Sequence, residues 1–374
     1  MISYLEIENF KCFAHLRLSF GALTLLTGFN GGGKSTAIHP ILLLAQSYMG
    51  TDGVDSLMLN GSLVRLGTVG DVLPADAKQS VLTFKASSES EEITWVTKAS
   101  AGDRHLSIAK SASQHHEATE SVKTTLSEGA GVVASLMCIA YISAIREGTS
   151  DAYPMPEVES NTIVNVGPDG RFAPYWYYQF ADDEVVENRR HPKEPASSFR
   201  KQLDAWLSSL FPGAQADVSH MPQVSLESLR FRQTNIGSWR RPANIGYGFT
   251  YAFPIIVQLL GASEGQTVVI DSPEAHLHPS AQSQMGRLLA FFAAAGVQII
   301  VETHSDHLLN GARLAVKERA LKANKLQIHF FTGADNTSHG VVSPAVNSEG
   351  QLSNWPDGFF DQSEKDLIQL SGWE

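Results

Sequence analysis

The chain has 374 residues, of which 43% are hydrophobic and 18% are charged, and its formal net charge is −11. This composition is typical of a globular protein with a sizeable core, and the acidic balance supports nucleic-acid binding only through a local basic patch. The two cysteines, Cys12 and Cys138, lack metal-ligand spacing, which favours a reducing cytoplasm over a disulfide framework. The sequence shows neither a signal peptide nor an apolar run of roughly 20 residues, so we expect a cytoplasmic protein without membrane contact.

Residues 1–60 are predicted to form a lobe of two strands, a glycine-rich turn and a helix with apolar residues at helical spacing. In residues 61–150, short β-rich runs separated by serine-rich turns predict an antiparallel β-subdomain. It ends in SLMCIAYISAIR, which we interpret as a buried strand leading to Arg146. Residues 151–229 are expected to be an insertion of loops with one helix, FRKQLDAWLSSL, which follows a capping serine and stops before Pro-Gly.

Residues 230–345 return to a strong α/β pattern. The apolar strands TVVID and VQIIVE flank a helix that begins at Pro279 and ends at Gly296. This β-α-β order predicts parallel, buried strands joined by a right-handed crossover. The tail, residues 346–374, is polar with aromatic anchors. Because the chain has no sustained heptads, we expect one α/β unit without a coiled-coil arm.

The strongest motif is GFNGGGKST, which fits G-x-x-x-x-G-K-[ST] between a predicted strand and a predicted helix. Glycines let backbone N–H groups approach phosphates, Lys34 supplies charge to the β- and γ-oxygens, and Ser35 can ligate Mg²⁺. The alternative is a glycine-rich turn that precedes Lys-Ser by chance. The residues expected to bind nucleotide here are Gly28, Asn30, Gly31, Gly32, Gly33, Lys34, Ser35 and Thr36.

The stretch VIDSPEAHLHP carries the next chemical signal. A nucleotide site of this kind needs a carboxylate at the end of a neighbouring strand to hold Mg²⁺, and Asp271 closes such a strand. A metal site built from His276 and His278 is the rival interpretation, but Pro279 and the following helix make this segment a turn. We therefore favour capping or packing roles for the two histidines.

A second polar stretch, VETHSD, follows the next predicted strand. If that strand runs parallel to the one that ends at Asp271, His304 lies at the same edge of the sheet, where ligands bind. There it could contact a γ-phosphate or hold the attacking water. A plain cap at a helix start is the alternative.

A second glycine-rich turn opens the apolar helix within residues 244–260. Gly246, Gly248 and Thr250 would form another anion-binding helix N-terminus. Since one phosphate-binding loop already serves one nucleotide, this second turn suggests a composite site. An ordinary helix cap is again the alternative.

These motifs in this order resemble those of the ABC-type ATPases, and more narrowly of their SMC/RecF-like and OLD-like branch, for which IENFKCF near the N-terminus is typical. PEAHLHP, ETHSDHLLNGAR and NWPDGFFDQ are similar to a compact subfamily with a C-terminal domain of unknown function, common in bacterial defence operons. The resemblance covers residues 1–75 and 230–370. It implies an α/β P-loop NTPase head of the ABC type, with an antiparallel β-subdomain, a helical or irregular insertion and no coiled-coil arm.

By position, the resemblance implies that residues 28–36 are the Walker A loop and that Asp271 is the Walker B acid. The turn at residues 245–251 would be the ABC signature, with Thr250 where serine is usual, and His304 would be the switch histidine. ATP and Mg²⁺ are the implied cofactors, and Ser35 and Asp271 the implied metal ligands. Two heads would close face to face as a homodimer or larger homo-oligomer. Asp71, or less favourably Gln46, would occupy the Q-loop position.

Two departures from the family pattern matter. Ser272 follows the Walker B acid where glutamate is usual, and serine cannot polarise water as a carboxylate does. Our hypothesis is that Glu274, interpreted as the only other nearby acid, takes or shares the role of general base, so that Glu274, His304 and Asp271 are the catalytic set. The alternative is that hydrolysis is slow. The second departure is the missing nuclease: the residues after His304 contain no D-x-D pair of the kind that a Toprim domain needs.

The expected function is therefore a nucleotide-gated dimeric ATPase that regulates a separate effector, such as a nuclease or toxin, in anti-phage defence. The alternative is a RecF-like DNA-binding clamp. A transporter ATPase is disfavoured because it would have glutamate after the Walker B acid. The cations that could contact DNA are Arg313, Lys317, Arg319, Lys322 and Lys325, expected on one helix, and Arg230, Arg232, Arg240 and Arg241.

Overall fold

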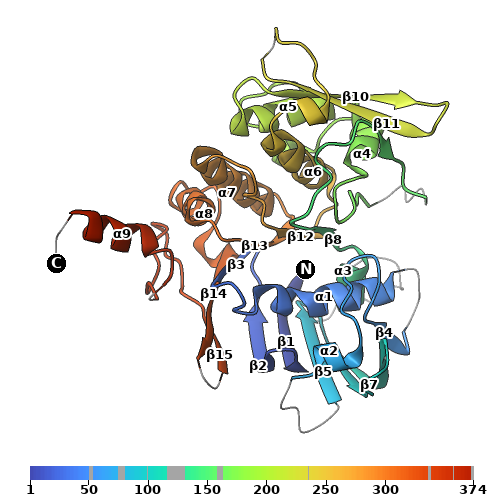
Figure 1. The fold of residues 1–374 in the computed structure, drawn as a ribbon, viewed down its shortest axis with the longest axis vertical. Coiled ribbons are helices and arrows are strands. Elements are labelled where there is room, and N and C mark those ends of the chain that lie inside the picture. Colours follow the sequence, from blue (N-terminus) through green and yellow to red (C-terminus); the bar gives the residue numbers. More distant parts are fainter. Residues whose placement is uncertain are drawn as a thin grey trace, which may run out of the picture.

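A six-stranded sheet forms the centre of the molecule, with strand order β15-β14-β3-β13-β12-β8 (Figure 1). The computed structural model describes residues 1–49, 54–74, 81–98, 100–115, 131–157, 163–234, 236–335, 338–356 and 358–371. Five strands are parallel and β15 is antiparallel. The central strands are β3 (Leu23–Gly28), β8 (Ala140–Ile142), β12 (Thr267–Asp271), β13 (Gln298–Glu302), β14 (Leu326–Asp335) and β15 (Ser338–Val342).

Each face of the central sheet is covered by its own hydrophobic core. Because side chains alternate along a strand, Val268 and Ile270 of β12 face one core while Val269 faces the other. The first core contains α6 (Tyr247–Gly261), α7 (Pro279–Ala294) and α8 (Asp306–Lys317), and the second contains α1 (Lys34–Tyr48). The expected β12-α7-β13 unit with parallel strands is confirmed.

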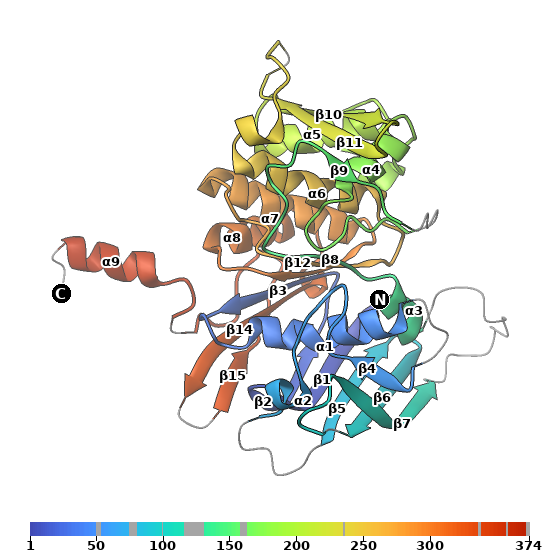
Figure 2. The ribbon, with the colours of Figure 1, turned by 45° about the vertical axis from the view of Figure 1, so that its right-hand side comes forward.

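A second, antiparallel sheet covers the far side of α1 (Figure 2). Its order is β2-β1-β5-β6-β7-β4, so it takes in the first two strands of the chain as well as the predicted β-rich runs. Its elements, with the short helix between them, are β1 (Ile2–Phe10), β2 (Phe13–Ser19), β4 (Ser56–Met58), α2 (Val69–Val72), β5 (Val81–Ser88), β6 (Glu91–Lys98) and β7 (His105–His115).

The segment interpreted as one long strand before Arg146 is mostly not a strand. Val132–Met137 forms helix α3, and only β8 is extended. The predicted strand was too long: its first residues, Ser135–Met137, end this helix, because Leu and Met fit a buried helix as well as a buried strand and periodicity alone cannot separate the two in a short apolar run.

The insertion forms a lobe that packs on α6 and contains a small sheet of order β10-β11-β9 (Figure 2). The predicted helix α5 is present, although Ser198 at its start makes no side-chain cap. The elements of this lobe are β9 (Tyr153–Pro154), α4 (Ala173–Phe180), η1 (Glu187–Arg189), α5 (Phe199–Leu210), β10 (Gln215–Met221), β11 (Leu226–Arg232) and η2 (Pro242–Asn244).

Two glycines hold α7 and α8 unusually close together. A Cβ atom on Gly286 would lie 2.2 Å from the carbonyl oxygen of Leu308, and one on Gly311 would lie 2.0 Å from that of Ser283. Only glycine permits such backbone contact. These helices follow β12 and β13, so the contact fixes the two strand ends relative to each other.

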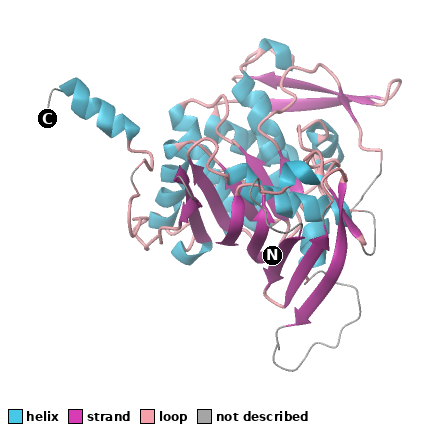
Figure 3. Cartoon of the chain, turned by 60° about the horizontal axis from the view of Figure 1, so that its bottom comes forward, coloured by secondary structure: helices cyan, strands magenta, loops and turns pink. Residues whose placement is uncertain are grey.

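The C-terminal part leaves the central sheet through β14 and β15 and ends in α9 (Gln362–Ser371), after the short turn η3 (Ala323–Lys325) that precedes β14. Helix α9 extends away from the body (Figure 3). Phe359 packs against Phe330 of β14, with ring centroids 4.9 Å apart, so the segment before α9 is anchored while the helix itself is exposed. No helix within the described ranges is long and apolar enough to cross a membrane.

Candidate active site

The GFNGGGKST loop connects β3 to α1 at the carboxyl edge of the central sheet, as predicted. Gly28, Gly31 and Gly33 all have positive φ angles, which glycine adopts without strain. A Cβ atom on Gly28 would lie 2.2 Å from the carbonyl oxygen of Phe331, and one on Gly33 would lie 2.5 Å from the ring of Phe13. The loop conformation therefore depends on glycine at both positions.

Lys34 lies inside this loop, with only 3% of its surface exposed. Its Nζ donates to the carbonyls of Gly28 and Phe29, at 3.0 and 2.8 Å, so the ammonium is held across the mouth of the loop. Burial lowers the pKa of Lys34, and the charges of Glu302 and Asp271 oppose that shift. A charged lysine held in this way is suited to phosphate oxygens.

Two carboxylates meet at the neighbouring strand ends. Asp271 ends β12 directly opposite Glu302, which ends β13, and Glu302 is in turn opposite Leu26 of β3. The Oγ of Ser35 donates to Oε1 of Glu302 at 3.0 Å. Asp271 accepts a hydrogen bond of 2.8 Å from the hydroxyl of Ser272. The edge therefore presents a hydroxyl and two carboxylates, the hard oxygen donors that Mg²⁺ prefers.

The pKa of Glu302 is raised to about 7, first by burial and then by the charge of Asp271, while Ser35 and Lys34 act in the opposite direction. The folded protein therefore keeps a proton on Glu302 over a pH range in which the unfolded chain has lost it. The free energy of unfolding should fall as pH rises from the ordinary glutamate value of 4.5 to about 7.

We expect the melting temperature of the metal-free protein to fall more steeply between about pH 5 and 8 than that of Glu302→Gln, which carries no titrating group there. Differential scanning fluorimetry in EDTA measures both curves. Parallel curves would contradict the assignment of the shift to Glu302.

His304 and Glu274 are joined by one hydrogen bond. The backbone N–H of His304 donates to Oε1 of Glu274 at 2.8 Å, while Oε2 of Glu274 is buried without a partner among the described residues. Burial raises the pKa of Glu274 and lowers that of His304, so a neutral imidazole faces the loop at physiological pH. His304 lies at the expected edge, on the wall of the same pocket as Lys34 and Glu302.

This pocket has a volume of about 370 Å³ and is open to solvent. It contains most of the predicted loop residues, but it does not reach Asp271 or Glu274. It is lined by Cys12, Asn30, Gly31, Gly33, Lys34, Ser35, Thr36, Glu302 and His304. Its backbone N–H groups, buried lysine and oxygen donors fit a nucleotide triphosphate with Mg²⁺, and Ser35 with Asp271 would hold the metal.

The second glycine-rich turn begins α6, with Gly246 as the N-cap residue. No residue of this turn lines the loop pocket. Gly246 has open space where a Cβ would be, and Tyr247 is 51% exposed, whereas Thr250 is buried and its hydroxyl donates to the carbonyl of Tyr247. The turn is therefore exposed at Gly246 and Tyr247, whereas Gly248 and Thr250 are buried within the chain.

The histidines of the PEAHLHP stretch have packing and capping contacts. His276 lies against the rings of Tyr247 and Tyr251, with centroids 5.2 and 4.7 Å apart. His278 is the N-cap residue of α7 and accepts from the N–H of Ser280. Within the described part of the chain, no group of metal-binding side chains forms at this turn.

Neither candidate for the Q-loop position reaches the pocket. Asp71 forms a capping box with Thr68 at the start of α2. Gln46 is buried on α1 and binds the carbonyl of Met58 and the N–H groups of Leu63 and Val64. Both side chains thus have local structural partners.

The sequence interpretation missed two residues that line this pocket, Glu302 and Cys12. Glu302 was passed over in favour of His304, and Glu274 was wrongly taken as the only other acid near Asp271. The parallel pairing of β12 with β13 places Glu302 there, and its position at a strand end was the available signal. Cys12, on the turn between β1 and β2, reaches the pocket through a long-range contact that no local pattern encodes.

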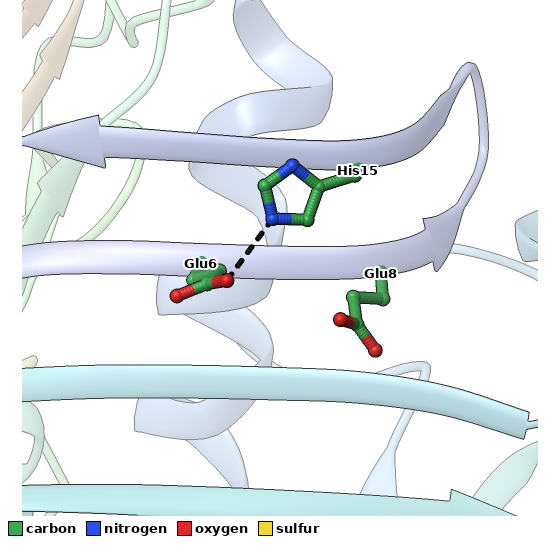
Figure 4. Close-up of side chains that lie close together, drawn as sticks. All are labelled: Glu6, Glu8 and His15. Carbon is green, nitrogen blue, oxygen red and sulfur yellow. Dashed lines mark hydrogen bonds and ion pairs between the residues drawn. The ribbon is translucent and has the colours of Figure 1, made fainter.

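A separate cluster, formed by Glu6, Glu8 and His15, lies on the outer face of the antiparallel sheet (Figure 4). His15 and Glu6 are 3.0 Å apart. Glu6 is also paired in register with Arg17 on one side and Lys85 on the other, so cations already flank it. We interpret this cluster as a solvated polar face.

The basic residues proposed for DNA contact do not lie on one helix. Helix α8 ends at Lys317, and Arg319 follows in a left-handed conformation. Arg313 binds the carbonyl of Gly350 and lies over Trp355. The remaining candidates are distributed over η3, β11 and the loop after β11. Helix propensity alone did not reveal the break after Lys317.

Comparison with known proteins supports the fold and part of the function. Residues 170–310 match a family described as "AAA domain, putative AbiEii toxin, Type IV TA system". Residues 321–370 match a family described as a protein of unknown function, DUF3696. No curated protein matches the chain.

Two solved structures share the fold over 99% of both chains. The Smc head domain with a coiled coil and joint derived from Pyrococcus yayanosii is 11% identical, with a TM-score of 0.54. The Smc head domain with an extended coiled coil bound to the C-terminal domain of ScpA, derived from Pyrococcus furiosus, is 12% identical, with a TM-score of 0.53.

The expected α/β P-loop head is therefore confirmed as the fold. The longest described helix, α7, has 16 residues, and the described ranges contain no coiled-coil arm. The fold is thus similar to that of SMC heads, and residues 170–310 are similar to an AAA domain.

Proposed function

We propose that the protein is a nucleotide-gated dimeric switch that binds and hydrolyses ATP and regulates a separate effector protein in anti-phage defence. The observation that carries this proposal is the separation of two phosphate-binding elements. The P-loop pocket has no lining residue from the α6 turn, and the start of that turn, Gly246 and Tyr247, is exposed on the surface of its own chain. If both bind one nucleotide, the α6 turn must come from a second copy.

In this mechanism the residues of one chain have distinct tasks. The loop amides and Lys34 would hold the phosphates, Ser35 and Asp271 would hold Mg²⁺, and His304 would face the γ-phosphate. Bound Mg²⁺ would supply charge neutralisation for the β- and γ-phosphate oxygens. Glu302 or Glu274 accepts the proton of the attacking water. The exposed Gly246 would cap the nucleotide held by the other chain, and the buried Gly248 and Thr250 would support that turn from within.

The effector role is supported by the wording of the matched family, which describes a putative toxin of a toxin–antitoxin system. The head structure from Pyrococcus furiosus holds a domain of ScpA, so a head of this fold can bind another protein. The alternative, a DNA-bound clamp, is weaker because Arg313, Arg232 and Arg241 already have partners within the chain. Salt-dependent retention of duplex DNA would favour that alternative.

Mass photometry with ATP and Mg²⁺ tests the composite site. Wild type should form dimers. Lys34→Ala should stay monomeric because it lacks the phosphate-binding charge. Gly246→Asp should bind a fluorescent ATP analogue yet stay monomeric, because its carboxylate repels the phosphate while remaining a good N-cap.

Mixing the two variants provides the decisive control. Lys34→Ala retains its α6 turn and Gly246→Asp retains its P-loop, so the mixture can build one composite site per dimer. Dimers that appear in the mixture but in neither variant alone support the proposal. Dimers that form equally in every sample, with or without ATP, exclude it.

A further inference from the structure

Arg146 is a buried arginine that the nucleotide contacts described above do not use. Only 4% of it is exposed, and it follows β8, which pairs with the strand that ends at Asp271. Its Nη2 donates to the carbonyls of Asp271 and Ser272, while Nε and Nη1 are buried without a hydrogen-bond partner among the described residues. Desolvating a guanidinium is costly, so its position requires an explanation beyond two backbone contacts.

One side of Arg146 touches the start of α6. Its guanidinium lies over the ring of Tyr251, 5.3 Å from the centroid. Two residues further along, a Cβ atom on Gly148 would come within 3.0–3.1 Å of Tyr247, Tyr251 and Thr250. The Arg146–Gly148 segment therefore packs directly on the start of α6.

The other side of Arg146 holds the turn after Asp271. Ser272 has a φ of 49°, a left-handed conformation that is unfavourable for a residue with a Cβ. The two carbonyls that flank this residue are those bound by Arg146. Burial lowers the pKa of Arg146 to about 10, and the charges of Asp271 and Glu274 act in the opposite direction. Arg146 thus stabilises the turn that directs Glu274 toward His304.

We propose that Arg146 is a positioning residue that couples the first turn of α6 to the turn that carries Asp271 and Glu274. The inference rests on the proposed function, in which α6 meets the nucleotide of a second copy. Contact with that nucleotide would press the α6 turn against Tyr251 and Gly148, and Arg146 would then fix the acids in their reactive arrangement. Binding of ATP to the P-loop does not involve Arg146.

A double-mutant cycle tests this coupling. Arg146→Met and Tyr251→Leu should each lower kcat by about tenfold or more, and the double variant should lose little beyond the larger single effect, because both break one connection. Tyr251→Phe, which keeps the ring face, should stay within about twofold of wild type. Arg146→Lys should recover part of the lost kcat. Affinity for a fluorescent ATP analogue should stay within about threefold in all variants, which separates positioning from general loss of structure.

Hydrogen exchange of the nucleotide-free protein gives a second readout that needs no activity. Ser272 donates its N–H to the carbonyl of Glu302 at 2.8 Å, and Ala275 donates to that of Ser272 at 3.1 Å. In Arg146→Met, exchange should accelerate both in the Ser272–Ala275 turn and in the first turn of α6, while the rest of α6 stays protected. Acceleration in only one of the two turns, or additive losses of kcat, would overturn the coupling.

If wild type neither dimerises nor hydrolyses ATP, the proposed function fails. The hydrogen-exchange experiment would then still test whether Arg146 connects the Ser272–Ala275 turn to the first turn of α6.

Discussion

Replacing Glu302 with glutamine is expected to lower ATP turnover by roughly 10²- to 10⁴-fold, the usual contribution of a general base. Glu302 lines the pocket beside Lys34 and His304, and it lies opposite Asp271. Glu274 instead accepts a hydrogen bond from the His304 backbone and lies outside the pocket lining. We therefore expect Glu274→Gln to lower ATP turnover less than Glu302→Gln does. Phosphate release under saturating ATP measures both.

The magnesium dependence separates two roles for Glu302. Its hydrogen bond with Ser35 also suits a residue that organises the metal. Recovery of Glu302→Gln at high Mg²⁺ would indicate metal binding, whereas a loss that Mg²⁺ does not repair would indicate the general base. Glu349→Gln, a change at an exposed turn, serves as the matched control. A larger loss in Glu274→Gln than in Glu302→Gln would return the role of base to Glu274.

Gly311→Ala and Gly286→Ala should each destabilise the fold by about 1–3 kcal/mol, the usual range for overpacking. In an ordinary helix, replacing glycine with alanine stabilises the protein by up to about 1 kcal/mol. A loss of stability would therefore indicate the close contact between α7 and α8. Here the added methyl would lie 2.0 or 2.2 Å from a backbone carbonyl oxygen of the facing helix. The helices would have to separate, and with them the ends of β12 and β13.

Chemical denaturation measures the loss, and turnover should fall in parallel because Asp271 and Glu302 lie at those strand ends. Gly102→Ala is the matched control, since Gly102 has open space around its Cβ position and should change neither quantity. Unchanged stability in both helix variants would contradict the close crossing of α7 and α8.

Much of the fold followed from local pattern. Continuous apolar runs bounded by a proline and a glycine identified β12, α7 and β13, because strands buried on both faces need apolar residues at every position. The helix α3 was missed for the converse reason, since a short apolar run fits either structure. The pairing of β1 with β5 joins residues that lie far apart in the chain, and such pairing leaves no local signal.

The site was predicted in part for similar reasons. A glycine-rich loop before a helix carries its chemistry in consecutive residues, so Lys34 and Ser35 were identified directly. Glu302 comes into the site through strand pairing, and Arg146 through packing on α6. Their interactions depend on tertiary contacts rather than on spacing, which is why the sequence pattern did not assign them.

The position of β3 in the central sheet has a consequence for how the chain acquires its structure. This strand carries the glycine-rich loop, and it lies between β13 and β14, whose residues follow it by 270 positions or more. During synthesis, β3 emerges from the ribosome long before β13 and β14 are made. It therefore stays unpaired while the intervening segments are synthesised. The glycine-rich loop is thus among the first segments to be made and among the last to reach its final surroundings. A chain that ends before β13 lacks the strands that pair with β3 and position this loop.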